Sequence, residues 1–224
     1  MKQYDAVIFD WDGTLMDSTH AIVSAIQLAC ADMQLPVPDR RQASWVIGLS
    51  IESALYHVAP DLSSDDLPHF VERYKHHFFQ HDRETPLFDG VPQLLNVLRE
   101  QRVKLAVATG KGRMGLDRVL AASRLGEYFD VTRCADESHG KPHPGMLHDI
   151  MGFLSLDPER VLMVGDTTHD VQMAHNAGVD SIAVSYGAHD LPTLQSANPT
   201  VLVHSVTEMH DWLSGRVVPA MRCD

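Results

Sequence analysis

Residues 6–14 read AVIFDWDGT, four apolar residues followed at once by two aspartates, a glycine and a threonine. The apolar half predicts a short strand buried on both faces, because a continuous run of such residues without polar alternation is typical of a covered parallel sheet. The acidic half begins where that strand ends. Ligands bind at the carboxyl ends of the strands in an open parallel sheet, so this stretch predicts both the first strand and the start of a functional site.

Similar runs recur later in the chain: VKLAVA at 103–108, RVLMV at 160–164, SIAVS at 181–185 and TVLV at 200–203. A weaker strand is expected at 130–134. Amphipathic segments of helical length separate these runs. Strands that alternate with helices in this way predict an α/β fold, a doubly wound parallel sheet with a Rossmann-like core and helices on both faces.

The alternation is interrupted once, between residues 16 and 85. Apolar residues recur there at helical spacing, as at Ile22 and Ile26, and no strand pattern is visible. The segment is too long for one crossover helix, and a loop of that length without structure of its own is uncommon in a compact domain. We therefore expect a small all-helical cap domain, residues 16–85, inserted into a catalytic core formed by residues 1–15 and 86–224.

Polar residues follow three of the predicted strands directly. They are Asp10 and Asp12 after the first run, Thr109, Gly110 and Lys111 after the second, and Asp166 and Asp170 after the run at 160–164. Four carboxylates at one edge of a sheet repel one another and resist ionisation unless a cation is present. Oxygen ligands that leave room for water and for substrate oxygens suit Mg²⁺. Lys141, in the loop HGKPHP, is a second candidate cation.

Asp10 and Asp12 are two residues apart, so on an extended strand end their side chains project to the same side. Gly13 allows the sharp turn that follows. One carboxylate can attack an electrophile while the other donates a proton to the leaving oxygen and later recovers it. The alternative is that these residues only end a strand and begin a turn, where Asp and Gly are common.

The four polar segments, in this order, resemble the motifs of the haloacid dehalogenase superfamily of phosphotransferases. Within it, the chain resembles the phosphoglycolate phosphatase-like branch, which has a helical cap after the first motif. DWDGT corresponds to the first motif, Thr109 to the second, Lys141 in KPHP to the third and GDTTHD to the fourth. The resemblance spans essentially the whole chain. Gly110 departs from the pattern, because Asn often follows the threonine in the closest relatives.

The resemblance implies a Mg²⁺-dependent phosphatase acting on a small phosphorylated metabolite, with phosphoglycolate as the leading candidate and pyrophosphate or a sugar phosphate behind it. Asp10 would be the nucleophile that forms an aspartyl-phosphate, and Asp12 would be the general acid and then the general base. The implied phosphate-binding residues are Thr109, Gly110 and Lys141. The implied metal site comprises Asp10, the backbone carbonyl of Asp12, Asp166, and Asp170 acting through water or by orienting the other ligands.

The cap would close over this site and recognise the leaving group. The residues that we expect to line it are Arg40, Arg41, Trp45, Ile47, Gly48 and Ser50, because a glycine-containing loop in the cap could face the core.

Three other functions fit parts of the sequence. Residues 110–115 match GxGxxG, which would suit a nicotinamide-dependent oxidoreductase, although Asp130 would lie at the wrong edge of the sheet to bind a ribose. A non-catalytic phospho-acceptor, similar to a response-regulator receiver, would also gather acidic residues, a threonine and a lysine. A phosphosugar mutase of the same superfamily would keep both Asp10 and Asp12.

Composition narrows the choice of partners and location. The 224 residues carry 30 acidic and 18 basic side chains, a net charge of −12 that opposes binding to nucleic acid or to anionic membranes. Cys30, Cys134 and Cys223 lack the spacing of a disulfide framework or zinc site, which favours a reducing compartment. The apolar run at 6–9 is too short for a signal peptide. We expect a cytoplasmic protein, either a monomer or a weak dimer.

Overall fold

The computed structural model describes residues 2–81 and 85–218 of the chain. One sheet of six parallel strands forms its centre, in the order β3-β2-β1-β4-β5-β6. The strands are β1 (Ala6–Phe9), β2 (Lys104–Thr109), β3 (Val131–Cys134), β4 (Val161–Gly165), β5 (Asp180–Val184) and β6 (Val201–Val203). Each lies within one residue of the run that predicts it, so the predicted α/β fold is confirmed.

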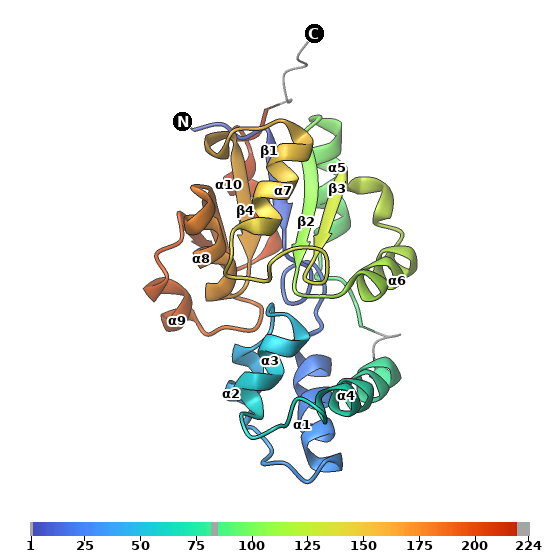
Figure 1. Ribbon diagram of the computed structural model, residues 1–224. Coiled ribbons are helices and arrows are strands. Elements are labelled where there is room, and N and C mark those ends of the chain that lie inside the picture. Colours follow the sequence, from blue (N-terminus) through green and yellow to red (C-terminus); the bar gives the residue numbers. More distant parts are fainter. Residues whose placement is uncertain (1, 82–84, 219–224) are drawn as a thin grey trace.

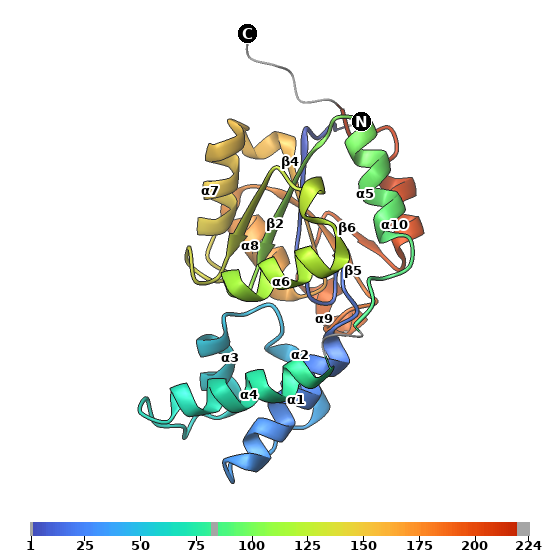
Figure 2. The ribbon, with the colours of Figure 1, turned by 90° about the vertical axis from the view of Figure 1, so that its right-hand side faces the viewer.

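Helices cover both faces of the sheet, which lies between them in Figures 1 and 2. Their bounds are α5 (Val91–Glu100), α6 (Arg113–Ser123), α7 (Gly145–Leu154), α8 (Thr168–Ala177), α9 (Leu191–Ser196) and α10 (Val206–Leu213). Alternate residues of β1 face opposite layers, as the period of a strand requires. Val7 and Phe9 pack with α5, α6 and α10, whereas Ala6 and Ile8 pack with α7 and α8.

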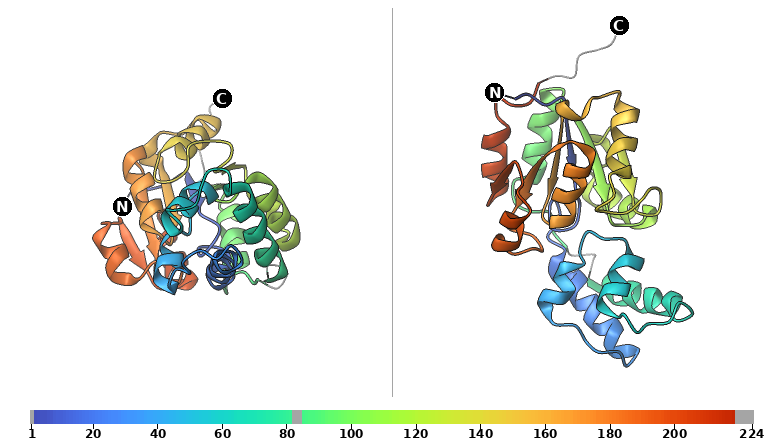
Figure 3. Two further views of the ribbon diagram at one scale, coloured as in Figure 1. Left: turned by 60° about the horizontal axis from the view of Figure 1, so that its bottom comes forward. Right: turned by 60° about the vertical axis from the view of Figure 1, so that its left-hand side comes forward.

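Four helices are inserted between β1 and α5: α1 (Thr19–Asp32), α2 (Arg40–Trp45), α3 (Ile51–Val58) and α4 (Leu67–His81). They bury an apolar cluster of their own around Ile26, Leu55 and Phe70. The left view of Figure 3 shows them in front of the core, at the end of the sheet where the strands finish. The two connecting segments are paired, because the amide of Asp17 donates to the carbonyl of Pro86 at 2.9 Å. The cap boundaries at residues 16 and 85 stay a prediction.

Two further features bear on where the protein could work. Within the described residues, no helix is both long enough and apolar enough to cross a membrane. Cys30 and Cys134 are buried free thiols, and Cys223 lies outside the described residues.

Candidate active site

The central strands of the sheet bring the first and fourth polar segments together. Chain order reverses beside β1, since β2 and β3 lie to one side of it and β4 to the other. In sheets of this topology the crevice at the carboxyl ends near such a reversal is where ligands bind. The amide of Asp10 donates to the carbonyl of Val164 at 2.8 Å, which continues the pairing of β1 with β4 by one residue. Asp10 and Asp166 are thereby held side by side.

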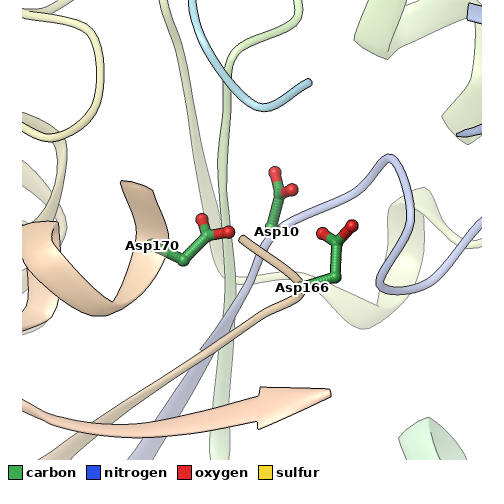
Figure 4. A group of neighbouring side chains, drawn as sticks. All are labelled: Asp10, Asp166 and Asp170. Carbon is green, nitrogen blue, oxygen red and sulfur yellow. The ribbon is translucent and has the colours of Figure 1, made fainter. Parts of the chain in front are cut away.

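Asp10, Asp166 and Asp170 form a buried group of carboxylates at this point. Each offers an oxygen within 4.8 Å of the others, and all three side chains are buried. Figure 4 shows their carboxyl groups pointing into one common space. Lys141 lies against the group, with its Nζ 2.7 Å from Asp10 Oδ1 and 2.7 Å from Asp170 Oδ1. Four of the sequence-predicted site residues therefore meet in one place.

Burial and the crowding of charge shift the pKa values of these groups. Burial raises the pKa of Asp10 to about 7, although the neighbouring Lys141 opposes the shift. Burial and the charges of Asp10 and Asp170 also raise the pKa of Asp166. Burial alone would lower the pKa of Lys141, but the two carboxylates beside it raise that pKa above its ordinary value. Lys141 therefore stays cationic, and one lysine is too little charge to neutralise three carboxylates.

The Asp166 carboxylate is fixed by groups on two other loops. Thr14 donates its hydroxyl to Asp166 Oδ1 at 3.0 Å, and the amide of Ala188 donates to Oδ2 at 2.7 Å. Gly13 has a φ of +81°, and a Cβ there would lie 2.1 Å from Asp166 Oδ2. A Cβ at Gly187 would lie 2.3 Å from the same oxygen. Both glycines are thus required for this carboxylate to occupy its place.

Asp170 is positioned by the first turn of α8. Thr167 is the N-cap of the helix, and its hydroxyl donates to Asp170 Oδ2 at 2.6 Å while its amide donates to the same oxygen at 3.1 Å. Thr167 Oγ1 also accepts the amide of Asp170 at 3.4 Å, which completes a capping box that satisfies amides without a partner inside the helix. Because Lys141 binds its other oxygen, Asp170 orients the lysine as well as the helix start.

The residues of this cluster fit a divalent metal ion. Asp10 Oδ2 is fully buried and has neither a hydrogen-bond partner nor an ion pair among the described residues. Such a group is costly unless a cation or donor meets it. Carboxylate oxygens around an excess of negative charge are the ligands that hard divalent cations prefer.

The side chain of Asp12 lies outside the cluster of carboxylates. Its Oδ1 accepts the hydroxyl of Ser18 at 2.7 Å, and its Oδ2 lies 2.9 Å from the Nζ of Lys111. Lys111 follows the second predicted strand, but the sequence gives no sign that it pairs with Asp12, and no motif singles out Ser18. Their contact with Asp12 depends on how the chain turns after Gly13.

Thr109 and Gly110 end β2 beside this pair. Thr109 is fully buried, and its hydroxyl accepts the amide of Lys111 at 3.2 Å. A Cβ on Gly110 would lie 2.4 Å from the carbonyl oxygens of both Gly48 and Leu49 in the cap. The absence of a side chain at Gly110 therefore lets the cap loop lie directly against the end of β2.

The glycines of the GxGxxG match have structural roles that need no dinucleotide. Gly110 contacts the cap, Gly112 is the N-cap of α6, and a Cβ on Gly115 would lie 3.1 Å from Cγ of Lys111. Asp130 precedes β3 and binds Lys104 and the amide of Leu105, away from the carboxyl ends of the strands. Asp136 follows β3 at the edge where a ribose would bind, but its carboxylate already accepts the amide of Arg113 at 3.0 Å.

The cap contacts the core through both the backbone and the ring of Trp45, a residue expected to line the site, whose ring centroid lies 4.7 Å from that of His169. His169 and His189 each donate Nε2–H to the carbonyl of Trp45, at 2.8 and 3.0 Å. Burial lowers the pKa of His169 to about 4 and also lowers that of His189, so both are neutral donors. Arg41 instead lies on the surface, 85% exposed in its side chain and paired with Asp190.

Comparison with known proteins identifies one matching family model and several similar proteins. A family model described as "Haloacid dehalogenase-like hydrolase" matches residues 7–184. A "Probable phosphatase IndB" from Dickeya dadantii (strain 3937) is 39% identical over 212 residues, which cover 91% of this chain and 90% of the relative. A "Tyrosine-protein kinase PtkA" from Mycobacterium tuberculosis (strain ATCC 25618 / H37Rv) is 32% identical and covers 90% of this chain and 69% of its own length.

A solved structure shares the fold. The crystal structure of a predicted phosphatase from Clostridium acetobutylicum superposes with a TM-score of 0.84 at 24% identity, covering 96% of this chain and all of the other. The α/β core and the inserted helices therefore recur together in a distant protein.

The raised pKa values of Asp10 and Asp166 predict a pH-dependent response to metal. Below about pH 7 the Asp10 carboxyl group holds a proton that a metal must displace, and the raised pKa of Asp166 acts in the same direction, so Mg²⁺ should bind more weakly at pH 5.5 than at pH 8. A fixed Mg²⁺ concentration should then raise the unfolding temperature more at pH 8, as measured by differential scanning calorimetry. Asp166→Asn should lose most of the increase. An equal increase at both pH values would contradict the assignment of these carboxylates as ligands.

The contact of Gly110 with the cap predicts that a side chain at this position lowers enzymatic activity. Gly110→Ala should push the loop at 48–49 away from the core and lower kcat/KM by about 10- to 100-fold, because small displacements of positioning groups have effects of that size. The melting temperature should change little, since the contact joins two separate apolar clusters. Gly152→Ala is the matched control, because a Cβ there meets nothing within 4 Å. Wild-type activity in Gly110→Ala would show that the loop does not rest on Gly110 during turnover.

Proposed function

The chain belongs to the haloacid dehalogenase-like hydrolases, and on this premise we propose that it is a Mg²⁺-dependent phosphatase of small phosphorylated metabolites. The observation that carries the proposal is the state of Asp10. Its carboxylate is buried at the end of β1, with Oδ1 on Lys141 and Oδ2 unpartnered. A carboxylate oxygen with no partner, beside a fixed cation, suits nucleophilic attack on phosphorus.

Asp10 is the nucleophile in this proposal. One oxygen of its carboxylate forms a bond to phosphorus as the bond from phosphorus to the leaving oxygen breaks, which gives an aspartyl-phosphate, and the other oxygen stays available to the metal ion. Lys141 neutralises charge on Asp10 and on the phosphoryl oxygens, while Thr109 and the amide of Gly110 donate hydrogen bonds to those oxygens. Phosphoryl transfer depends mainly on such positioning and neutralisation.

Asp12 transfers the proton. It follows Asp10 by two residues, and contacts with Ser18 on one oxygen and Lys111 on the other fix the position of its carboxyl group. It gives a proton to the leaving oxygen in the first step and accepts one from the attacking water in the second. Water then releases inorganic phosphate and restores Asp10.

Asp10, Asp166 and the backbone carbonyl of Asp12 would hold Mg²⁺. Asp170 would act indirectly, because Lys141 and Thr167 already bind its two oxygens. The ion would supply positive charge against the phosphoryl oxygens and the excess of buried carboxylate. The donor set supports this choice, since all the ligands are hard oxygens.

Phosphoglycolate is the leading candidate substrate, followed by pyrophosphate and a sugar phosphate. A mutase of the same superfamily would need the phosphoenzyme to persist until a sugar phosphate reoriented, whereas hydrolysis needs only water. We also propose a cytoplasmic location, which the free thiols of Cys30 and Cys134 support.

The proposed mechanism predicts which residue carries the phosphoryl group in the covalent intermediate. Asp10→Asn should abolish phosphate release from p-nitrophenyl phosphate, by at least about 1,000-fold, because no attacking oxygen remains. Rapid quenching of wild-type enzyme followed by borohydride reduction and mass spectrometry should locate the adduct on Asp10. Asp149→Asn, on the exposed side of α7, is the control and should keep wild-type activity. An adduct on Asp12, or interconversion of sugar phosphates without free phosphate, would contradict the proposal.

A further inference from the structure

Lys111 is a second buried cation in the site, distinct from Lys141. Its side chain is 11% exposed, and its Nζ lies 2.9 Å from Asp12 Oδ2. Among the described residues, Asp12 is its one salt-bridge partner. An ammonium group has three hydrogens to donate, so Lys111 has capacity for a further anionic or polar partner.

The position of Lys111 is determined by both the core and the cap. Its Nζ lies over the ring of Phe78, 4.9 Å from the centroid, and Phe78 belongs to helix α4 of the inserted segment. Phe78 is 4% exposed, so this side of the ammonium is closed by an apolar group. Gly115 leaves the space that the lysine stem occupies, because a Cβ there would lie 3.1 Å from Lys111 Cγ. The lysine is therefore held in place, unlike a mobile surface side chain.

The two lysines serve different halves of a bound phosphoester. Lys141 binds Asp10 and Asp170, and so lies where phosphorus is attacked. Lys111 binds Asp12, the group that must reach the leaving oxygen in order to protonate it. The first atoms of the leaving group must therefore lie near Asp12, within reach of the Lys111 ammonium.

The cap loop above this position offers little to a neutral, hydroxyl-rich leaving group. Residues 46–50 are Val46, Ile47, Gly48, Leu49 and Ser50. Ser50 has the one polar side chain, and its hydroxyl donates to Ser53 Oγ at 3.0 Å within the N-cap of α3. The side chains of this loop therefore give little selectivity for a hydroxyl-rich group, whereas a carboxylate or phosphate would meet the Lys111 ammonium beside an apolar ring, where charged hydrogen bonds are strong.

We propose that Lys111, backed by Phe78 of the cap, forms a subsite for a small anionic leaving group, with a carboxylate or phosphate close to the ester oxygen. This inference rests on the phosphatase function proposed above and concerns its substrate specificity. It divides the site between a phosphoryl half around Lys141 and a leaving-group half around Lys111.

The test compares two esters that differ in one charge, 2-phosphoglycolate and 2-hydroxyethyl phosphate. Lys111→Met should lower kcat/KM for both esters, because Asp12 loses its ion pair, but the loss for 2-phosphoglycolate should exceed that for 2-hydroxyethyl phosphate by about 10- to 100-fold, as expected when a hydrogen bond to a charged group is also lost. Lys111→Arg should keep the preference for the anionic ester. Lys104→Met, at the far end of β2 and 42% exposed, is the matched control and should behave as wild type.

An inhibition experiment gives the same comparison without relying on either ester. Glycolate should inhibit hydrolysis of p-nitrophenyl phosphate by the wild type, ethylene glycol should not, and Lys111→Met should weaken inhibition by glycolate about 10-fold. Equal losses on both esters, with unchanged inhibition by glycolate, would overturn the subsite and show that Lys111 acts only by positioning Asp12. Absence of phosphate release from all three esters in the presence of Mg²⁺ would overturn the proposed function itself.

Discussion

The ion pairs of Lys141 with Asp10 and Asp170 are the constraint on which the rest of the site depends. Three carboxylates within 4.8 Å of one another are buried at the end of a parallel sheet, where water cannot screen their repulsion. Lys141 offsets part of that charge and ties the loop after β1 to the first turn of α8. What remains is a site with a net negative charge and one unpartnered oxygen, which is suited to a cation and then to a phosphoryl group.

The fold supplies this arrangement through the order of its strands. β1 pairs with both β2 and β4, so the residues that follow these three strands converge without any long-range loop. The inserted segment leaves the core after Met16, a few residues beyond Asp12, and returns beside the point of exit, where Asp17 pairs with Pro86. The segment that covers the site is therefore joined to the residues that act on the substrate, and its loop at 48–49 reaches Gly110.

Much of the fold and of the carboxylate cluster can be predicted from the sequence alone, because the patterns that indicate them lie within short stretches of the chain. Buried strands read as apolar runs, and residues after those runs must meet at one edge, so the positions of Asp10, Asp166 and Asp170 follow from topology. The contacts made by the cap do not follow, since they depend on how one domain is oriented on the other. For this reason the contact of the cap loop with Gly110 and the surface position of Arg41 emerge only from the structure. The pairing of Lys111 with Asp12 lies within the core, and it emerges only from the structure because it depends on how the chain turns after Gly13.

The central claim is that Lys141 and Asp170 form one charge-compensated unit with Asp10, and a double-mutant cycle on metal-free protein tests it most directly. Urea unfolding of Lys141→Met should show a loss of ~3–5 kcal/mol in the free energy of unfolding, because buried carboxylates lose their cation. Adding Asp170→Asn should restore part of that loss, since one of the uncompensated charges is removed. Strictly additive losses from the two substitutions would contradict the account.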